Sequence, residues 1–94
     1  MRVFVSSPSD TIAPPVLAYA ELRIFAALAP YPEVEGARVV LHQDEDAGAM
    51  RCSVNVDFVT AGSAKTRASG PHAAATIDRA AERVGRMMRR RSPL

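Results

Sequence analysis

The C-terminal segment carries the residues whose types and spacing could do chemistry. Residues 79–91 contain six arginines and one glutamate. Four of the arginines are separated by four, three and four residues, so a helix would place them in one stripe. These four are Arg79, Arg83, Arg86 and Arg90, and Arg89 flanks them. Because a guanidinium keeps its charge at physiological pH and its planar fork suits phosphate, we interpret the stripe as a candidate contact for a polyanion.

Two plainer explanations of the same arginines stay open. Basic residues near a helix C-terminus compensate its dipole, which would account for those around 88–91 but not for Arg79 and Arg83. The chain also holds eleven Arg against one Lys, and 17 Ala, a composition that a GC-rich genome would produce without any partner. The charge is unevenly placed, however, because residues 33–46 hold five acids and one Arg. This asymmetry favours an oriented interaction with a polyanion.

The length and composition indicate one small domain. We expect the 94 residues to form a single domain over 1–91, with 92–94 as a tail or the start of a linker. Much of the apolar content is alanine, so we expect stability near the low end of about 5–15 kcal/mol. A single cysteine excludes an internal disulfide and a Cys-rich zinc site. No run suits a membrane span or a signal peptide, so we expect a cytoplasmic protein.

Alternating and helical periodicities predict six elements. The clearest signal is RCSVNVDFV, where Cys52, Val54, Val56 and Phe58 alternate with polar residues and should point inward. The predicted strands are 2–6, 37–42, 51–59 and 64–69, and the predicted helices are 14–29 and 73–91. The order is β-α-β-β-β-α. We therefore predict an α+β fold, a four-stranded mixed sheet with two helices packed on one face.

Basic residues outside the final helix could support the stripe. Lys65 and Arg67 should lie on the outward face of the sheet, and Arg23 lies on the first helix. A platform for single-stranded RNA also needs aromatic side chains on which bases stack. The later strands offer none outward, and Phe4 on the first strand is the one candidate. This favours recognition of backbone and shape over reading of sequence.

The first helix presents apolar residues where basic ones would be needed to bind RNA. Ala18, Leu22, Phe25 and Ala29 fall on the side that faces away from the predicted core. An exposed apolar patch is more typical of a protein contact. The alternative function is therefore a protein-interaction module in which Leu22 and Phe25 mediate homodimerisation or the docking of another domain, and in which the arginines only keep the protein soluble.

A series of apolar and basic residues, spread over nearly the whole chain, has the spacing of a known family. The positions are Val3, Val5, Ile12, Val16, Tyr19, Arg23 and Ile24, then Val39 and Leu41, and finally Ala68, 75–78, Ala80, Arg83 and Val84. In this order the chain resembles the N-terminal domain of ribosome hibernation promoting factors, also called the ribosome-associated inhibitor or sigma-54 modulation family. Most of the shared positions reflect core spacing, and I-D-x-A-x-x-R-V with the basic segment after it is the most specific part.

The resemblance implies a non-catalytic protein that occludes the decoding channel of the small ribosomal subunit and holds ribosomes inactive under stress. Its basic residues would contact ribosomal RNA phosphates. The chain departs from the family at its helix starts, where Ala13 and Pro14 replace a capping Thr and Asp, and His72 and Ala74 replace an Asp and a Tyr. Long members add a linker and a dimerisation domain, so we expect a short form, a divergent member or a fragment. An RNA-binding domain of related topology that acts on other duplex RNA also stays open.

No pattern of catalytic or metal-ligating residues appears. His42, His72 and Cys52 are the only nitrogen or sulfur ligands, and they are widely spaced. The acidic run 44–46 suits a solvated loop better than a calcium site. The serines at 6, 7 and 9 have no neighbouring base to activate them. We therefore expect no enzyme, no cofactor, no metal site, no small-molecule substrate and no membrane partner.

Overall fold

The computed structural model describes residues 1–44, 46 and 48–91. Its elements are β1 (Arg2–Ser6), α1 (Pro14–Leu28), β2 (Val34–Asp44), β3 (Ala49–Phe58), β4 (Ser63–Gly70) and α2 (Ala73–Arg91). This order, with one four-stranded mixed sheet, confirms the fold predicted from the sequence. The predicted tail at 92–94 and part of the acidic loop lie outside the described residues. Among those described, neither helix is both long and apolar enough to cross a membrane.

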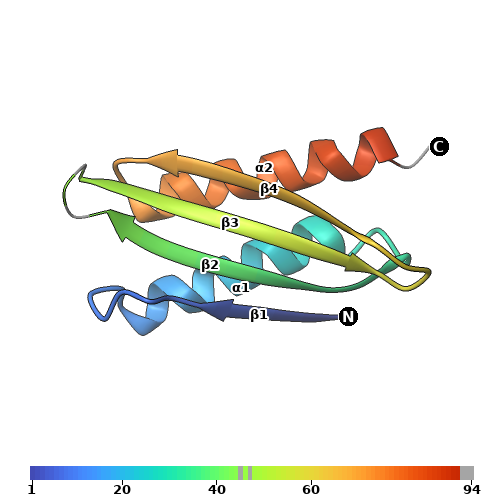
Figure 1. Cartoon of the computed structure of the whole chain (residues 1–94), viewed down its shortest axis with the longest axis horizontal. Coiled ribbons are helices and arrows are strands. Elements are labelled where there is room, and N and C mark those ends of the chain that lie inside the picture. The colour runs from blue at the N-terminus through green and yellow to red at the C-terminus, as the bar shows by residue number, and fades with distance from the viewer. Residues whose placement is uncertain (45, 47, 92–94) are drawn as a thin grey trace.

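The sheet has the order β1-β2-β3-β4, so β1 and β4 are its two edges. β1 and β2 run parallel and are joined by α1, whereas β2, β3 and β4 form an antiparallel meander. Both helices lie behind the sheet in Figure 1, with α1 packed on β1 and β2 and α2 packed on β3 and β4. The opposite face of the sheet is therefore open along its whole length.

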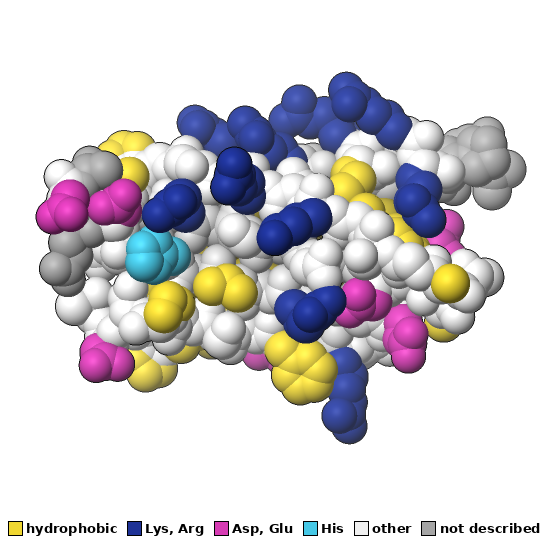
Figure 2. Space-filling view, in the orientation of Figure 1, with side chains coloured by type: hydrophobic (Ala, Val, Ile, Leu, Met, Phe, Trp, Pro, Cys, Tyr) yellow, Lys and Arg dark blue, Asp and Glu magenta, His cyan; other side chains and the backbone are white. Residues whose placement is uncertain are grey.

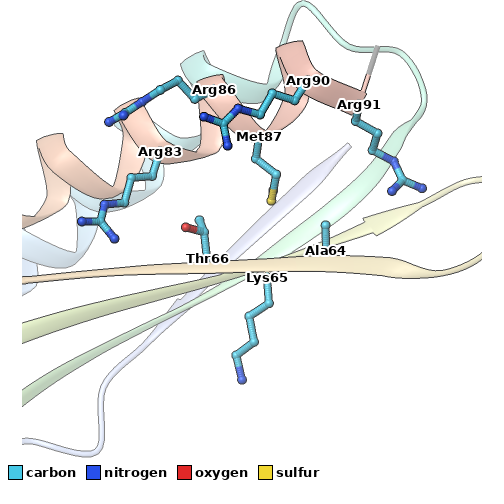
Figure 3. Close-up of a pocket in the computed structure, with 8 residues that line it drawn as sticks. All are labelled: Ala64, Lys65, Thr66, Arg83, Arg86, Met87, Arg90 and Arg91. Atoms are coloured by element: carbon cyan, nitrogen blue, oxygen red, sulfur yellow. The ribbon is translucent and has the colours of Figure 1, made fainter. Parts of the chain in front are cut away.

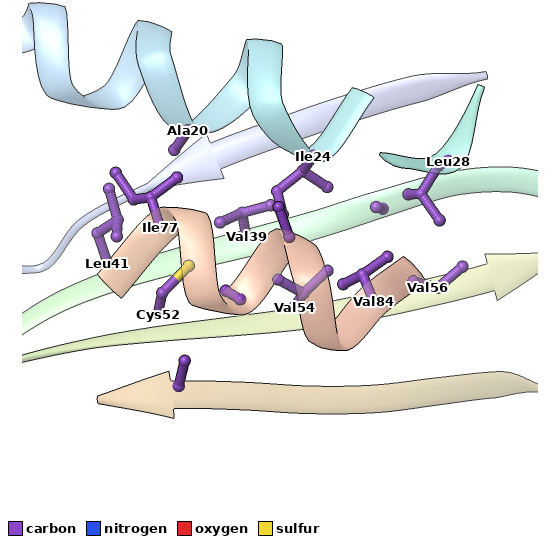
Figure 4. Packing of buried hydrophobic residues seen from close by; sticks show 14 of the residues in the cluster. Ala20, Ile24, Leu28, Val39, Leu41, Cys52, Val54, Val56, Ile77 and Val84 are labelled. Atoms are coloured by element: carbon purple, nitrogen blue, oxygen red, sulfur yellow. The ribbon is translucent and has the colours of Figure 1, made fainter. Parts of the chain in front are cut away.

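The core lies between the sheet and the two helices (Figure 4). The inward residues of β3 that the alternation predicted are Cys52, Val54, Val56 and Phe58, and all four are buried. From the helices, the large fully buried apolar side chains are Ile24, Leu28, Ile77, Val84 and Met88. Within each helix these residues are four or seven positions apart, which places them on a single apolar face.

The start of α1 follows from its two prolines. Pro14 and Pro15 occupy the first helical positions, where a missing N–H costs nothing. Ala13 precedes them and provides no side-chain hydrogen bond to the helix, as its replacement of a capping residue predicted. Pro30 follows the end of the helix and cannot continue it, since it has no N–H to donate. The helix ends at Leu28, one residue earlier than predicted.

β2 is longer than the predicted 37–42 and begins at Val34. Val34 is only 4% exposed and lies opposite Phe58 on β3. The register shifts between Val34 and Gly36, and this bulge interrupts the alternation on which the prediction depended. Gly36 pairs with Arg2 of β1, and a Cβ at position 36 would lie 2.7 Å from the Arg2 carbonyl oxygen. Glycine is therefore required where β1 and β2 first meet.

We expect Gly36→Ala to lower the free energy of unfolding by about 1–3 kcal/mol, because the added methyl group would push β1 from β2. Urea unfolding followed by circular dichroism measures this. Gly85→Ala in α2 is the matched control, since its Cβ would meet only the flexible end of Arg89 at 3.2 Å. That variant should be neutral or more stable by up to about 1 kcal/mol. Equal stability of the two variants would contradict the assigned β1–β2 contact.

Candidate nucleic-acid interface

The arginine stripe of α2 lies along the open edge of β4. Arg79 Nη1 donates a hydrogen bond to the Ser69 carbonyl oxygen at 3.1 Å, and Arg83 Nη1 donates to the Arg67 carbonyl oxygen at 2.9 Å. Because β4 is an edge strand, the outer side of its backbone has no neighbouring strand. The two arginines therefore occupy part of an edge that would otherwise be free to pair with another chain, and they tie the helix to the sheet.

A basic groove separates α2 from β4 and has a volume of about 570 Å³. Its lining consists of Ala64, Lys65, Thr66, Arg83, Arg86, Met87, Arg90 and Arg91. In Figure 3, Ala64 and Thr66 project from β4 toward the helix and Met87 projects toward the strand, while the Lys65 side chain points away from α2. The groove thus has a small, mostly apolar floor beneath a row of guanidinium groups.

The arginines of the groove differ in how much of their hydrogen-bonding capacity is already used. A guanidinium has five N–H donors, and Arg83 uses one of them on β4. The Arg91 guanidinium lies 3.9 Å from the centre of the Phe58 ring, which is a cation–π contact. Arg86 and Arg90 are exposed, and the guanidinium group of neither has an ion pair or hydrogen bond within the described part of the chain. Arg86 and Arg90 are therefore the groove residues whose guanidinium groups are most available to a ligand.

Arg89 and Arg23 lie on another side of the protein. A second hollow, of about 480 Å³, opens between α1 and α2, and both residues line it together with Arg86 and Glu82. Arg23 is committed to an ion pair there, because its Nε lies 3.0 Å from Asp78 Oδ1. Of the residues predicted to contact RNA, Arg86 alone borders both hollows, so it links the groove to this second surface.

Lys65 and Arg67 lie on the open face of the sheet. The strand register aligns Lys65 with Asn55 and Arg38, and it aligns Arg67 with Ser53 and Val40. Figure 2 views this face and shows dark-blue side chains scattered over the strands, with a denser row along the edge formed by α2. The structure thus divides most of the predicted contact residues among the groove, the hollow between the helices and the sheet face, while Arg79 lies at the edge of β4 beside the groove.

A polar cluster that joins the helices was not predicted from periodicity. The Tyr19 hydroxyl and the Arg23 Nε both donate hydrogen bonds to Asp78 Oδ1. The bond from Tyr19, and then the bond and charge of Arg23, hold the pKa of Asp78 below its usual value. The bond to Asp78 raises the pKa of Tyr19 in turn. The signal that could have revealed the cluster is that all three residues occupy positions shared with the family that the sequence resembles.

The residues considered as metal ligands do not come together. Among the residues that the structure describes, no group of three or more His, Cys, Asp or Glu side chains could hold a metal ion. His42 is half-buried on β2 and His72 is exposed before α2. Burial raises the pKa of the Cys52 thiol to about 11, which keeps it protonated and unreactive at neutral pH. Cys52 is therefore a core residue, as the alternation predicted.

Comparison with known proteins places this geometry in a known fold. No model of a protein family and no curated protein matched the chain. Among solved structures, a ribosomal subunit interface protein from Coxiella burnetii is similar, with a TM-score of 0.83, 12% identity and coverage of 97% of each chain. The N-terminal domain of Protein Y from Thermus thermophilus is also similar, with a TM-score of 0.75, 24% identity and coverage of 97% of this chain and 96% of that one. This chain has the fold of those two proteins.

The low pKa of Asp78 predicts a loss of stability in acid. A carboxylate with a lowered pKa in the folded state stabilises the protein fully above its unfolded value, about 3.9, and this contribution is lost as the pH falls through the lower folded value. We expect the urea midpoint to fall as the pH drops below about 4, and Asp78→Asn to show a smaller fall. Tyr19→Phe, which keeps the carboxylate and Arg23, should lie between them. An identical acid response in Asp78→Asn would contradict this role.

Proposed function

We propose that the protein is a non-catalytic, cytoplasmic factor that binds the small ribosomal subunit, occludes its decoding channel and keeps ribosomes inactive under stress. The observation that carries the proposal is the arginine-lined groove between α2 and β4, on a fold shared with a ribosomal subunit interface protein. The resemblance of the sequence to hibernation factors supports the same function. The contact residues are Arg79, Arg83, Arg86, Arg89 and Arg90, assisted by Arg23, Lys65 and Arg67.

The groove suits an RNA backbone because some of its guanidinium groups are unpaired and others are held in position at β4. Arg86 and Arg90 have free guanidinium groups, and each can form a charge-assisted, two-point contact with phosphate. Arg79 and Arg83 are held at β4 by one hydrogen bond each, which fixes their position and leaves other donors available. A row of cations fixed in this way follows a phosphate backbone without reading bases.

Inhibition then requires only that the protein fill space. The molecule is elongated, with extents of 40 × 20 × 20 Å. A body of this shape, held by phosphate contacts along one long side, would block the path of a messenger RNA or transfer RNA without any chemical step. Release would leave both the ribosome and the protein unchanged, as a reversible inactive state requires.

Binding to small subunits should be strongly salt-dependent and should weaken when the groove loses charge. If five to six phosphates are contacted, the log–log slope of affinity against salt is roughly −4 to −5. Arg86→Glu/Arg90→Glu should reduce affinity by roughly tenfold or more and make the slope shallower by about 2. Co-sedimentation with small subunits across a salt series measures both quantities.

The control compares two single variants of exposed arginines. Arg90→Glu lies in the groove, whereas Arg2→Glu lies on β1 at the opposite edge of the sheet. The groove variant should bind much more weakly than the β1 variant. Binding that is insensitive to salt, or an equal loss in both variants, would contradict the proposal.

The exposed face of α1 favours a second candidate function, self-association. Leu22 and Phe25 are 65% and 47% exposed, as expected from the sequence. Between α1 and the open edge of β1 lies a hollow of about 480 Å³ that Phe25 lines together with Glu21 and Arg2. In a twofold dimer built on this mostly apolar surface, Glu21 of each copy could pair with Arg2 of the other. A second copy of the chain is therefore the proposed occupant.

If this surface forms a dimer, Phe25→Asp should raise the dissociation constant by roughly tenfold or more, because it buries a charge in an apolar contact. Sedimentation equilibrium of the wild type and the variant measures the shift. Glu21→Gln should weaken the dimer less. A wild-type protein that is monomeric at the highest concentrations tested would exclude this second function and leave the ribosomal one intact.

A further inference from the structure

An aromatic ring stands on the open face of the sheet. Phe4 of β1 is 59% exposed, and its ring also borders the hollow between β1 and α1. The register aligns Phe4 with Arg38 on β2, and Arg38 with Asn55 on β3. Asn55 is aligned in turn with Lys65 on β4. One row across all four strands therefore holds an aromatic ring, a guanidinium, an amide and an ammonium group.

A hollow of about 680 Å³ lies over this row. Phe4, Arg38, Asn55 and Lys65 line it together with Ser6, Val40 and Ser53. Arg38 pairs with Asp57 at 3.2 Å, which holds its guanidinium near the row while other N–H donors stay available. The Lys65 side chain has no ion pair or hydrogen bond among the described residues. The hollow thus combines one stacking surface, several hydrogen-bonding groups and two cations.

We propose that this face binds a stretch of single-stranded RNA, with one unpaired base stacked on Phe4 and the flanking phosphates contacted by Arg38 and Lys65. The side-chain amide of Asn55 lies between the two cations and can hydrogen-bond to the edge of the base. Stacking on an aromatic ring is tolerant of sequence, because every base has a π face. This site lies on the opposite side of the sheet from the helices and does not depend on the ribosome.

The charges of the face favour RNA over a protein partner. The described residues that lie on this face or border it include five cations, Arg2, Arg38, Arg51, Lys65 and Arg67, against three acids, Glu35, Asp44 and Asp57. The exposed large apolar side chains in the hollow are Phe4 and Val40, too few for the apolar centre of a protein interface. A single aromatic ring among cations and amides is instead the composition of a stacking platform.

The absence of tryptophan from the sequence allows a direct test. Phe4→Trp introduces a single fluorophore at the proposed stacking position, and Leu22→Trp introduces the same fluorophore on the exposed face of α1, where no base should bind. Titration with single-stranded oligo(U) RNA should quench the tryptophan at position 4 and not the one at position 22. Equal quenching at both positions, or none at position 4, would overturn the proposal.

Affinity provides a second, independent readout. Phe4→Ala should weaken the binding of oligo(U), measured by fluorescence anisotropy, roughly 5- to 100-fold, the loss of one stacked base. Its affinity for a duplex of the same length should not change, since a paired base cannot stack on Phe4. Leu22→Ala, which removes another exposed apolar side chain, is the control and should bind like wild type. A Phe4→Ala variant that binds oligo(U) like wild type would contradict the site.

Failure of this proposal and failure of the groove are distinguishable. Arg86→Glu/Arg90→Glu should leave the quenching amplitude at position 4 unchanged at saturating RNA, even where it abolishes binding to small subunits. If the fluorescence of Phe4→Trp shifts with protein concentration in the absence of RNA while that of Leu22→Trp on α1 does not, the sheet face is a contact between copies of the chain. That outcome would also overturn the proposal.

Discussion

The amphipathic helix α2 can bury Ile77, Val84 and Met88 against the sheet in only one rotational setting, and this setting decides where its arginines lie. Because α2 packs on β3 and β4, its arginine stripe is directed to the outer edge of β4. There Arg79 and Arg83 meet backbone carbonyl groups that have no neighbouring strand. The same contact that fixes the helix therefore creates the groove, and a helix rotated by one residue would lose both.

A sheet covered on only one face leaves distinct surfaces, and their chemistry differs from one side of the protein to the other. The β4 side carries the free guanidinium groups of Arg86 and Arg90, whereas α1 at the other side carries exposed Leu22 and Phe25. The open face between them is basic, with Phe4 near the β1 edge. The ion pair of Arg23 with Asp78 offsets the positive charge of Arg23 on the α1 side. The two sides of the protein therefore differ more in charge.

Periodicity in the sequence predicted most of the fold, because each strand and helix buries one face and the pattern records it. It failed at the start of β2, where the bulge before Gly36 breaks the alternation. It also aligned the α2 arginines correctly along their own helix, but gave no information about what they touch. The hydrogen bonds of Arg79 and Arg83 to β4, and the cluster around Asp78, join elements that are distant in sequence, and only packing brings them together.

The central claim is that the groove between α2 and β4 contacts ribosomal RNA, and site-specific photo-cross-linking tests it most directly. A photoreactive amino acid at position 90 places the probe in the groove, and one at position 22 places it on α1. With small subunits bound, position 90 should form cross-links to ribosomal RNA and position 22 should not. RNA cross-links from position 22 alone, or none from position 90 while the protein co-sediments, would contradict the account.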